Sequence, residues 1–361
     1  MNKKEVAEIK KRMKEDKTNI DVVAGCYVDS SKNKVAKFSK QFLTLQDDEV
    51  NRYLEIAKKC LSGKLGNNLI ELEFPLDEEK DGGAQHGLLG LCKSGLKNED
   101  VLDTFYDRII ETYNKVENYL IVLFHENYDV PVKGKDNLAM DDSDSVYEYI
   151  ICAICPVDLT KGGLGYTEAD GVDVINGNWM VKPPETGFLF PAFTDRASDI
   201  HSVLMYTKDA KEPHTEFMED TLACPAKDTD DIVRGNIEGM LEHELKLAGS
   251  SDDEVAEKIL LFHKGLHDKL ASVNAEGTAA AEVEAVEMTE EIVTDVLNEL
   301  DLTEEVIDNV SIAFGKDFKD SKPYVSKVCN ESLLSKEELL LENIELKKRI
   351  SVLAKKLNEK A

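Results

Sequence analysis

The run Val146-Tyr-Glu-Tyr-Ile-Ile-Cys-Ala-Ile-Cys155, with Tyr119-Leu-Ile-Val-Leu-Phe-His125 before it, decides the fold class. Both runs are apolar and of strand length, so we expect two central strands that are buried on both faces of a sheet. Residues 129–145 between them are expected to form a polar, acidic loop. Cys152 and Cys155 have CxxC spacing, but residues i and i+3 of a strand point to opposite faces. We therefore interpret the two thiols as small buried side chains rather than as a zinc or redox motif.

Strand and helix patterns are mixed on both sides of these runs. Alternating apolar residues predict strands, and apolar residues at helical spacing predict helices. The expected strands are 20–28, 35–38, 69–74, 188–193 and 203–206, the expected helices are 3–16, 47–61, 85–93 and 99–114, and 164–181 is expected to be a hairpin-like excursion. The order lacks the βαβα alternation of a doubly wound sheet. We predict an α+β fold with a mixed or antiparallel sheet and packed helices, in an α+β subdomain at 1–115 and a β-rich subdomain at 116–245.

The strand signal almost disappears after residue 250, and an acidic, all-helical region is expected at 250–320. The segment 271–315 contains no Lys or Arg, while acidic residues are frequent. Thr289 and Thr303 each stand where an N-cap is expected, and each is followed by two glutamates, which the helix dipole favours in a first turn. Such a region could bind a protein partner with a basic surface.

A last helix is expected at 330–361, where apolar residues repeat every seven positions. The heptad seam consists of Leu339, Leu346 and Leu353 at d positions and Asn343, Ile350 and Leu357 at a positions. A single Asn at an a position favours a parallel dimer in register, and Glu342 at g could meet Lys347 at e of a partner. The seam spans about three heptads, so the sequence leaves three interpretations open: a homodimeric coiled coil, an amphipathic helix that docks on its own chain, or a disordered tail.

One polar cluster, Thr194-Asp-Arg-Ala-Ser-Asp-Ile-His201, follows a predicted strand. An Asp–His pair, from Asp195 or Asp199 with His201, could act as a general base, and Arg196 could bind an anion. These four residues are the candidate catalytic residues. The alternative interpretation is a structured loop in which an Asp caps a turn and Arg196 forms a buried ion pair.

Two other patterns are interpreted structurally. His263 and His267 lie one helical turn apart, which can suit a metal, but no third ligand is evident and solvated helix histidines are expected. Gly82-Gly-Ala-Gln85 is interpreted as a turn before a helix. We therefore expect no metal site and no cofactor.

Composition excludes several classes of function. Lys and Arg number 44 and Asp and Glu 72, so the net charge is 44 − 72 = −28. Binding to nucleic acid is therefore not expected, nor is binding to anionic lipid, because both require cations. No run approaches the roughly 20 apolar residues of a membrane span, and no signal peptide is expected. The odd number of scattered cysteines, 7, indicates reduced thiols and a cytoplasmic protein.

Several blocks of the sequence together resemble one family of bacterial proteins, DUF4317, whose function is not established. These blocks are Met1-Asn-Lys-Lys-Glu5, Gly25-Cys-Tyr-Val-Asp29, Leu61-Ser-Gly-Lys-Leu-Gly-Asn-Asn68, Phe74-Pro75, Asn118-Tyr-Leu-Ile121, Tyr128-Asp-Val-Pro131, Ile154-Cys-Pro-Val157, Gly187-Phe-Leu-Phe-Pro-Ala-Phe193 and Asp195-Arg-Ala-Ser-Asp-Ile-His201. The resemblance covers roughly residues 1–225, and the tail after about 320 looks unlike the family. It implies a bacterial, cytosolic protein, and it carries over no activity, cofactor or catalytic residue.

Three hypotheses for function follow. The first is a non-enzymatic protein-interaction or regulatory factor, because known catalytic motifs are missing while the heptad seam and the acidic tract are present. The second is a hydrolase that acts on an anionic small substrate through the 194–201 cluster. The third, suggested only by the Gly82–Gln85 loop and by a length that fits several domains, is a translation-associated or ribosome-associated factor.

Overall fold

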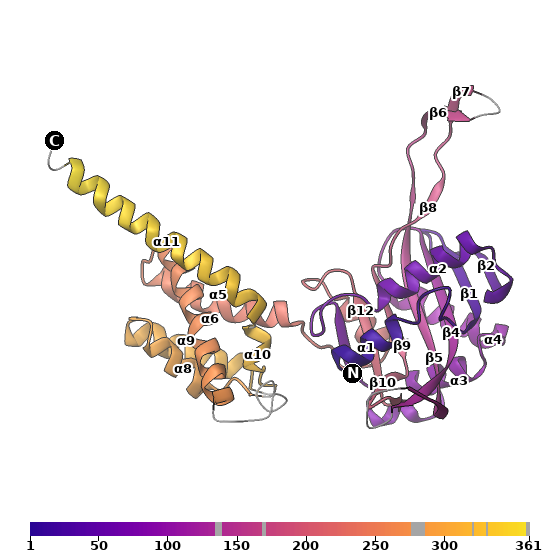
Figure 1. Ribbon diagram of the computed structural model, residues 1–361, viewed down its shortest axis with the longest axis horizontal. Helices are drawn as coiled ribbons and strands as arrows, with labels where there is room; N and C mark the ends of the chain where they lie inside the picture. Colours follow the sequence, from indigo (N-terminus) through magenta and orange to yellow (C-terminus); the bar gives the residue numbers. More distant parts are fainter. Residues whose placement is uncertain (134–138, 168–170, 276–285, 320, 330, 359–361) are drawn as a thin grey trace. The chain divides into compact units, whose positions relative to one another are not determined.

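The computed structural model describes residues 1–133, 139–167, 171–275, 286–319, 321–329 and 331–358 (Figure 1). The chain divides into two compact units, a sheet unit at residues 1–229 and a helical unit at residues 230–361. The sheet unit has two hydrophobic cores, one on each face of its sheet, and the helical unit has one. The two units are described separately below.

An antiparallel sheet forms the centre of the sheet unit, with strand order β2-β1-β4-β5-β9-β12-β3 and β8 paired to β5. Its strands are β1 (Ile20–Val28), β2 (Lys34–Gln41), β3 (Leu69–Glu73), β4 (Tyr119–Lys133), β5 (Ala139–Leu159), β8 (Trp179–Val181), β9 (Thr186–Phe190) and β12 (Ser202–Thr207). The two runs predicted to be central strands lie in β4 and β5, which are neighbours. The expected loop at 129–145 is wrong for its described ends, because β4 and β5 continue through residues 129–133 and 139–145.

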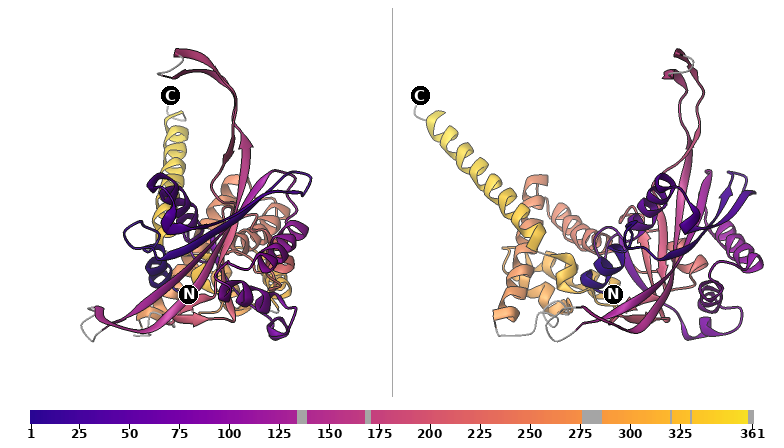
Figure 2. Two further views of the ribbon diagram at one scale, coloured as in Figure 1. Left: turned by 90° about the vertical axis from the view of Figure 1, so that its right-hand side faces the viewer. Right: turned by 45° about the vertical axis from the view of Figure 1, so that its right-hand side comes forward.

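Helices cover both faces of this sheet (Figure 2). Helices α1 (Lys3–Lys10) and α2 (Asp47–Cys60) pack on one face, and α3 (Ala84–Lys93) and α4 (Glu99–Thr112) pack on the other. Short helical turns lie at η1 (Phe42–Thr44), η2 (Leu76–Glu79) and η3 (Phe217–Thr221). Cys152 belongs to the core under α3 and α4, whereas Cys155 belongs to the core under α1 and α2. The interpretation of this CxxC pair as buried side chains on opposite faces is confirmed.

A narrow β-arm extends from the sheet, as Figure 1 shows. It contains β8 and a hairpin of β6 (Gly163–Thr167) and β7 (Gly171–Ile175), which confirms the predicted excursion at 164–181. Leu164 pairs with Val174 and Tyr166 pairs with Val172, so these four side chains share one face of the hairpin. All four are exposed. Strand β8 adds the exposed side chain of Trp179.

The helical unit contains the described helices α5 (Asp230–Leu247), α6 (Asp252–Ala275), α8 (Glu290–Asn298), α9 (Glu304–Asp317), α10 (Val325–Val328) and α11 (Glu331–Asn358). The apolar faces of α5, α6, α8, α9 and α10 meet in one core, which includes Leu241, Phe262 and Val296. Thr289 caps α8 as predicted, and its side chain accepts from the N–H of Ile292. Thr303 occupies the N-cap position of α9, but its side chain forms no capping hydrogen bond.

The predicted α+β class is confirmed, since an antiparallel sheet with packed helices is followed by a helical unit. Residue 115 lies between α4 and β4, and strands from both sides of it belong to the same sheet. Among the described residues, no helix has the length and apolar character needed to cross a membrane.

Candidate functional site

The polar cluster at 194–201 forms a tight β-turn. Strands β10 (Ala192–Thr194) and β11 (Ala197–Asp199) pair so that Thr194 lies opposite Ala197, which leaves Asp195 and Arg196 as a two-residue loop. Their φ angles are +51° and +60°. A type I′ hairpin turn requires positive φ at both loop positions, where Asn-Gly is the usual pair. Asp195 and Arg196 adopt positive φ less readily than Asn-Gly does, and contacts with other elements hold them in this conformation.

Carboxylates of α1 hold both residues of the two-residue loop. The N–H of Asp195 donates to Glu5 of α1 at 2.9 Å, and Arg196 donates to Glu8 of α1 at 2.8 Å. The carboxylate of Asp199 accepts from the backbone N–H of His201 at 3.1 Å.

The imidazole of His201 is exposed and lies 2.9 Å from Glu79 of η2. This arrangement matches the alternative interpretation, a structured loop with an Asp cap and an Arg ion pair. Catalysis by the four residues stays a prediction, and the contacts described here do not direct their side chains toward a shared pocket.

A second polar cluster, which the sequence analysis missed, lies in the sheet at His125. Strand β1 contains one extra residue at this point, because Ile20 is opposite Glu126 while Val22 is opposite His125. A β-bulge of this kind redirects a side chain. The bulge residue, Asp21, brings its carboxylate to 2.6 Å from Nδ1 of His125.

The other ring nitrogen of His125, Nε2, lies 3.0 Å from Glu148 Oε1 on β5. Cys92 of α3 completes the group: one ligand atom each from Cys92, His125 and Glu148 lies within 4.8 Å of the others. His125 and Cys92 are buried, whereas the side chain of Glu148 is 40% exposed. Burial, reinforced by the charge of Glu148, raises the pKa of the Cys92 thiol to about 12. The four residues of this His125 cluster come from four elements, and no sequence motif links them.

The next residue, Glu126, points to the opposite face of β4, where it is also buried. Arg12 donates to Glu126 Oε1 at 2.6 Å, and the hydroxyl of Tyr149 donates to Oε2 at 2.7 Å. The backbone N–H of Asn19 adds a third hydrogen bond, at 3.0 Å. This fully engaged carboxylate anchors the segment after α1 to the sheet.

The heptad seam of α11 is exposed wherever its side chains are described. Leu339, Leu346, Ile350 and Leu353 have between 47% and 65% of their surface exposed. Asn343 is also exposed, and its side-chain amide donates to the backbone carbonyl of Leu339 at 2.8 Å. The side chain of Leu357 lies outside the described residues. The described seam positions therefore form an apolar stripe along one side of α11.

Helix α11 packs on α6 through its other side. Glu337, Leu341, Ile344 and Lys348 follow helical spacing, and none of them is a seam residue. Glu337 lies 3.0 Å from His263 of α6, and Lys348 forms an ion pair with Glu257 of α6. Leu341 and Ile344 are half-buried. The docked side of α11 thus leaves the seam uncovered.

The expectation of solvated histidines on α6 is wrong for His263, which is only 3% exposed. Its Nδ1 lies 3.0 Å from Glu337 of α11 and its Nε2 lies 3.2 Å from Glu238 of α5, which also contacts Arg234. Burial lowers the pKa of His263, but the close contacts with the carboxylates of Glu238 and Glu337 outweigh burial. The pKa is therefore raised above its ordinary value of 6.5.

The raised pKa of His263 predicts how the stability of the helical unit depends on pH. Protonated His263 stabilises the contact of α5, α6 and α11, fully below the unfolded-state pKa and progressively less as pH rises through the folded-state pKa. We expect amide hydrogen exchange in α6 and α11 to differ most between wild type and His263→Gln below the ordinary histidine pKa, and to converge as pH rises through the raised folded-state pKa of His263. A difference that is constant or grows over this range would contradict the ion-pair role.

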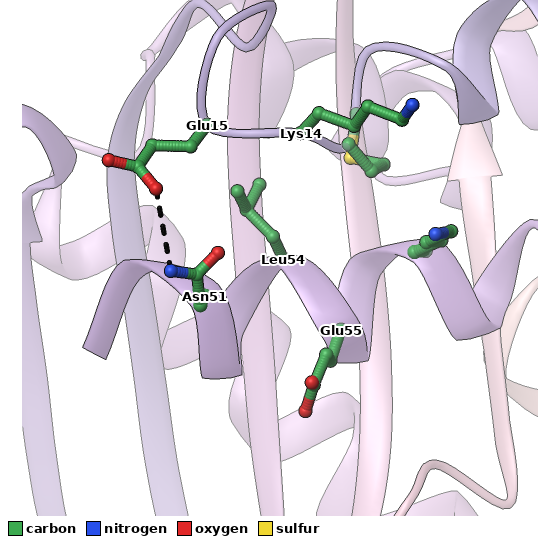
Figure 3. Close-up of a pocket in the computed structure, with 7 residues that line it drawn as sticks. Lys14, Glu15, Asn51, Leu54 and Glu55 are labelled. Carbon is green, nitrogen blue, oxygen red and sulfur yellow. Dashed lines mark hydrogen bonds between the residues drawn. The ribbon is translucent and has the colours of Figure 1, made fainter. Parts of the chain in front are cut away.

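A shallow hollow lies between the segment after α1 and helix α2 (Figure 3). It has a volume of about 260 Å³ and is lined by Met13, Lys14, Glu15, Asn51, Leu54, Glu55 and Lys58. Asn51 donates to Glu15 across it at 3.4 Å. Its polar groups do not converge on one point, so it offers little to a specific ligand.

Comparison with known proteins gives one family. The model of a family described as Domain of unknown function (DUF4317) matches residues 1–358. The predicted resemblance is confirmed, but its expected extent to residue 225 is too short, and the expectation that the tail departs from the family is wrong. No curated protein matches the chain.

Proposed function

We propose that this chain, which belongs to the DUF4317 family over residues 1–358, is a non-enzymatic protein-interaction factor. It forms a homodimer through the heptad seam of α11. The observation that carries this proposal is the exposure of the described seam positions on a helix whose other side is docked. Of the interpretations that the sequence left open, this arrangement favours the homodimeric coiled coil.

A second copy of the same helix is the occupant that fits this seam best. Leu and Ile at alternating d and a positions form knobs that pack into holes of an identical helix. Asn343 at an a position would face its own copy in a parallel pair and would be offset in other registers. Glu342 and Lys347 are both exposed, at g and e positions where opposite charges meet across a parallel dimer.

The contacts of α11 with α6 lower the entropy cost of forming a dimer through a short seam. An isolated helix of three heptads would lose much conformational entropy on pairing, and it would be marginally stable alone. Helix α11 is held by the ion pairs of Glu337 and Lys348, so part of this ordering cost is met before association.

We place this function in the cytosol. All 7 cysteines are free thiols in the structure, and all are buried. Thiols in this form suit a reducing compartment. Their burial also leaves no exposed native thiol, which makes an introduced surface cysteine a selective probe.

Disulfide trapping tests the pairing of the seam. Leu353→Cys places a thiol at a d position, and a parallel in-register dimer brings the two copies within the roughly 4.4–6.8 Å Cα separation that a disulfide needs. Mild oxidation is expected to give a covalent dimer on a non-reducing gel. The matched control is Val352→Cys, one residue away at an exposed position off the seam. Equal cross-linking of the two variants, or none in either, would overturn the proposed pairing.

A further inference from the structure

We propose that Cys92, His125 and Glu148 bind one Zn²⁺ ion, and that Asp21 orients the imidazole of His125 through its Nδ1. This site lies in the sheet unit, and it does not depend on the proposed dimer. The three ligand atoms come from α3, β4 and β5, and each atom lies within 4.8 Å of the others.

The spacing of the ligands suits a tetrahedral ion. Zinc–nitrogen and zinc–oxygen bonds of about 2.0–2.2 Å at tetrahedral angles hold N and O about 3.3 Å apart. Nε2 of His125 and Oε1 of Glu148 are already 3.0 Å apart. A small side-chain rotation would therefore admit the ion between them, with the sulfur of Cys92 as the third ligand.

The donor types select among metals. A thiolate and an imidazole favour Zn²⁺ over Ca²⁺ and Mg²⁺, which prefer oxygen ligands. The second carboxylate, from Asp21, lies 2.6 Å from Nδ1 of His125, so Nε2, which faces Glu148, is the nitrogen available to the metal. A carboxylate–histidine–zinc arrangement of this kind fixes the imidazole tautomer and makes the ligand more basic.

A bound cation would also place positive charge beside the two carboxylates of the cluster. The carboxylates of Asp21 and Glu148 flank the buried imidazole of His125, and the ammonium of Lys97 lies 3.6 Å from Asp21. Bound Zn²⁺ would release the thiol proton to solvent as the sulfur becomes a thiolate ligand. Three protein ligands would leave a fourth position for water, on the side where Glu148 is exposed.

A Cys–His–Asp nucleophile is the competing interpretation of the same residues. A nucleophilic cysteine requires an accessible thiol with a lowered pKa. Cys92 is buried, and its pKa is raised to about 12. A buried thiol is therefore poorly placed for nucleophilic attack, whereas a bound Zn²⁺ would itself displace the proton of a ligating thiol.

Calorimetric titration of the chelator-treated full chain with Zn²⁺ tests the proposal. We expect one ion per chain in the wild type, at least about 100-fold weaker binding in Cys92→Ser and Glu148→Gln, and 10–100-fold weaker binding in Asp21→Asn. Cys224→Ser removes another buried thiol of the same core, and Glu73→Gln neutralises an exposed strand glutamate, so both controls should bind like wild type.

Co²⁺ gives an independent readout, because a thiolate ligand produces a charge-transfer absorption band. The band is expected in wild type and Cys224→Ser and is expected to disappear in Cys92→Ser. Glu148 is partly exposed, so Glu148→Gln keeps the test valid if Cys92→Ser misfolds. Absence of stoichiometric Zn²⁺ binding by wild type, or unchanged affinity in Glu148→Gln, would overturn the site.

Discussion

Ile350→Lys is expected to convert the protein from a dimer into a monomer of 40.3 kDa, the mass of one chain. Ile350 is the described apolar residue at an a position of the seam, and its side chain is 65% exposed on the single chain. The substitution removes two buried isoleucines from each dimer and places two like charges opposite each other. The lost burial alone is worth about 3 kcal/mol or more, or roughly a hundredfold in the dissociation constant.

Light scattering during size-exclusion chromatography measures this change directly. The matched control is Val352→Lys, which makes the same exchange of an exposed β-branched residue on the same helix but off the seam. The control should stay dimeric. If Val352→Lys dissociates as much as Ile350→Lys, charge on α11 and not the seam determines the mass, and the proposed pairing fails.

Glu126→Ala is expected to destabilise the sheet unit by about 3–5 kcal/mol, the loss typical of breaking a buried ion pair from one side. The side chain of Glu126 is 1% exposed. Its removal leaves Arg12, the N–H of Asn19 and the hydroxyl of Tyr149 without the acceptor that each now uses. Buried donors without acceptors cost much more than the net value of the original bonds.

Urea unfolding checks this prediction, with a lower midpoint at unchanged slope as the expected sign of lost stability. Arg52→Ala is the control, because it removes an ion pair with Glu55 in which both side chains are largely exposed. That loss should stay below about 1 kcal/mol. A loss for Glu126→Ala no larger than for Arg52→Ala would show that the buried carboxylate is not an anchor.

The central strands were predictable because burial on both faces leaves a continuous apolar pattern. The runs 119–125 and 146–155 lie in β4 and β5, and Cys152 and Cys155 face opposite cores as strand periodicity requires. The ends of these strands were missed. Asp129, Pro131 and Lys133 interrupt the apolar pattern, and residues 141–145 are all Asp or Ser, so this composition resembles a loop although the ladder continues through residues on both sides.

The candidate sites were less predictable, for three physical reasons. The polar residues of 194–201 form a two-residue turn whose positive φ angles are supported by contacts with α1, and no local pattern reveals such contacts. The His125 cluster depends on the bulge at Asp21, which only the strand pairing shows. His263 lies among helical residues that resemble a solvated face, yet glutamates from α5 and α11 enclose it.

For the heptad seam of α11, the residues were predictable but their partner was not. Heptad spacing predicted its positions, but sequence could not decide between a second copy and the chain's own surface. That choice depends on which side of α11 meets α6, and therefore on tertiary packing around His263 and Glu257.

The solution mass of the unaltered full chain tests the central claim most directly. Light scattering over a range of protein concentrations should give twice 40.3 kDa, falling toward 40.3 kDa only on dilution. A chain that remains monomeric up to about 1 mM would self-associate with less than about 4 kcal/mol, and that result would contradict a homodimer formed through the α11 seam.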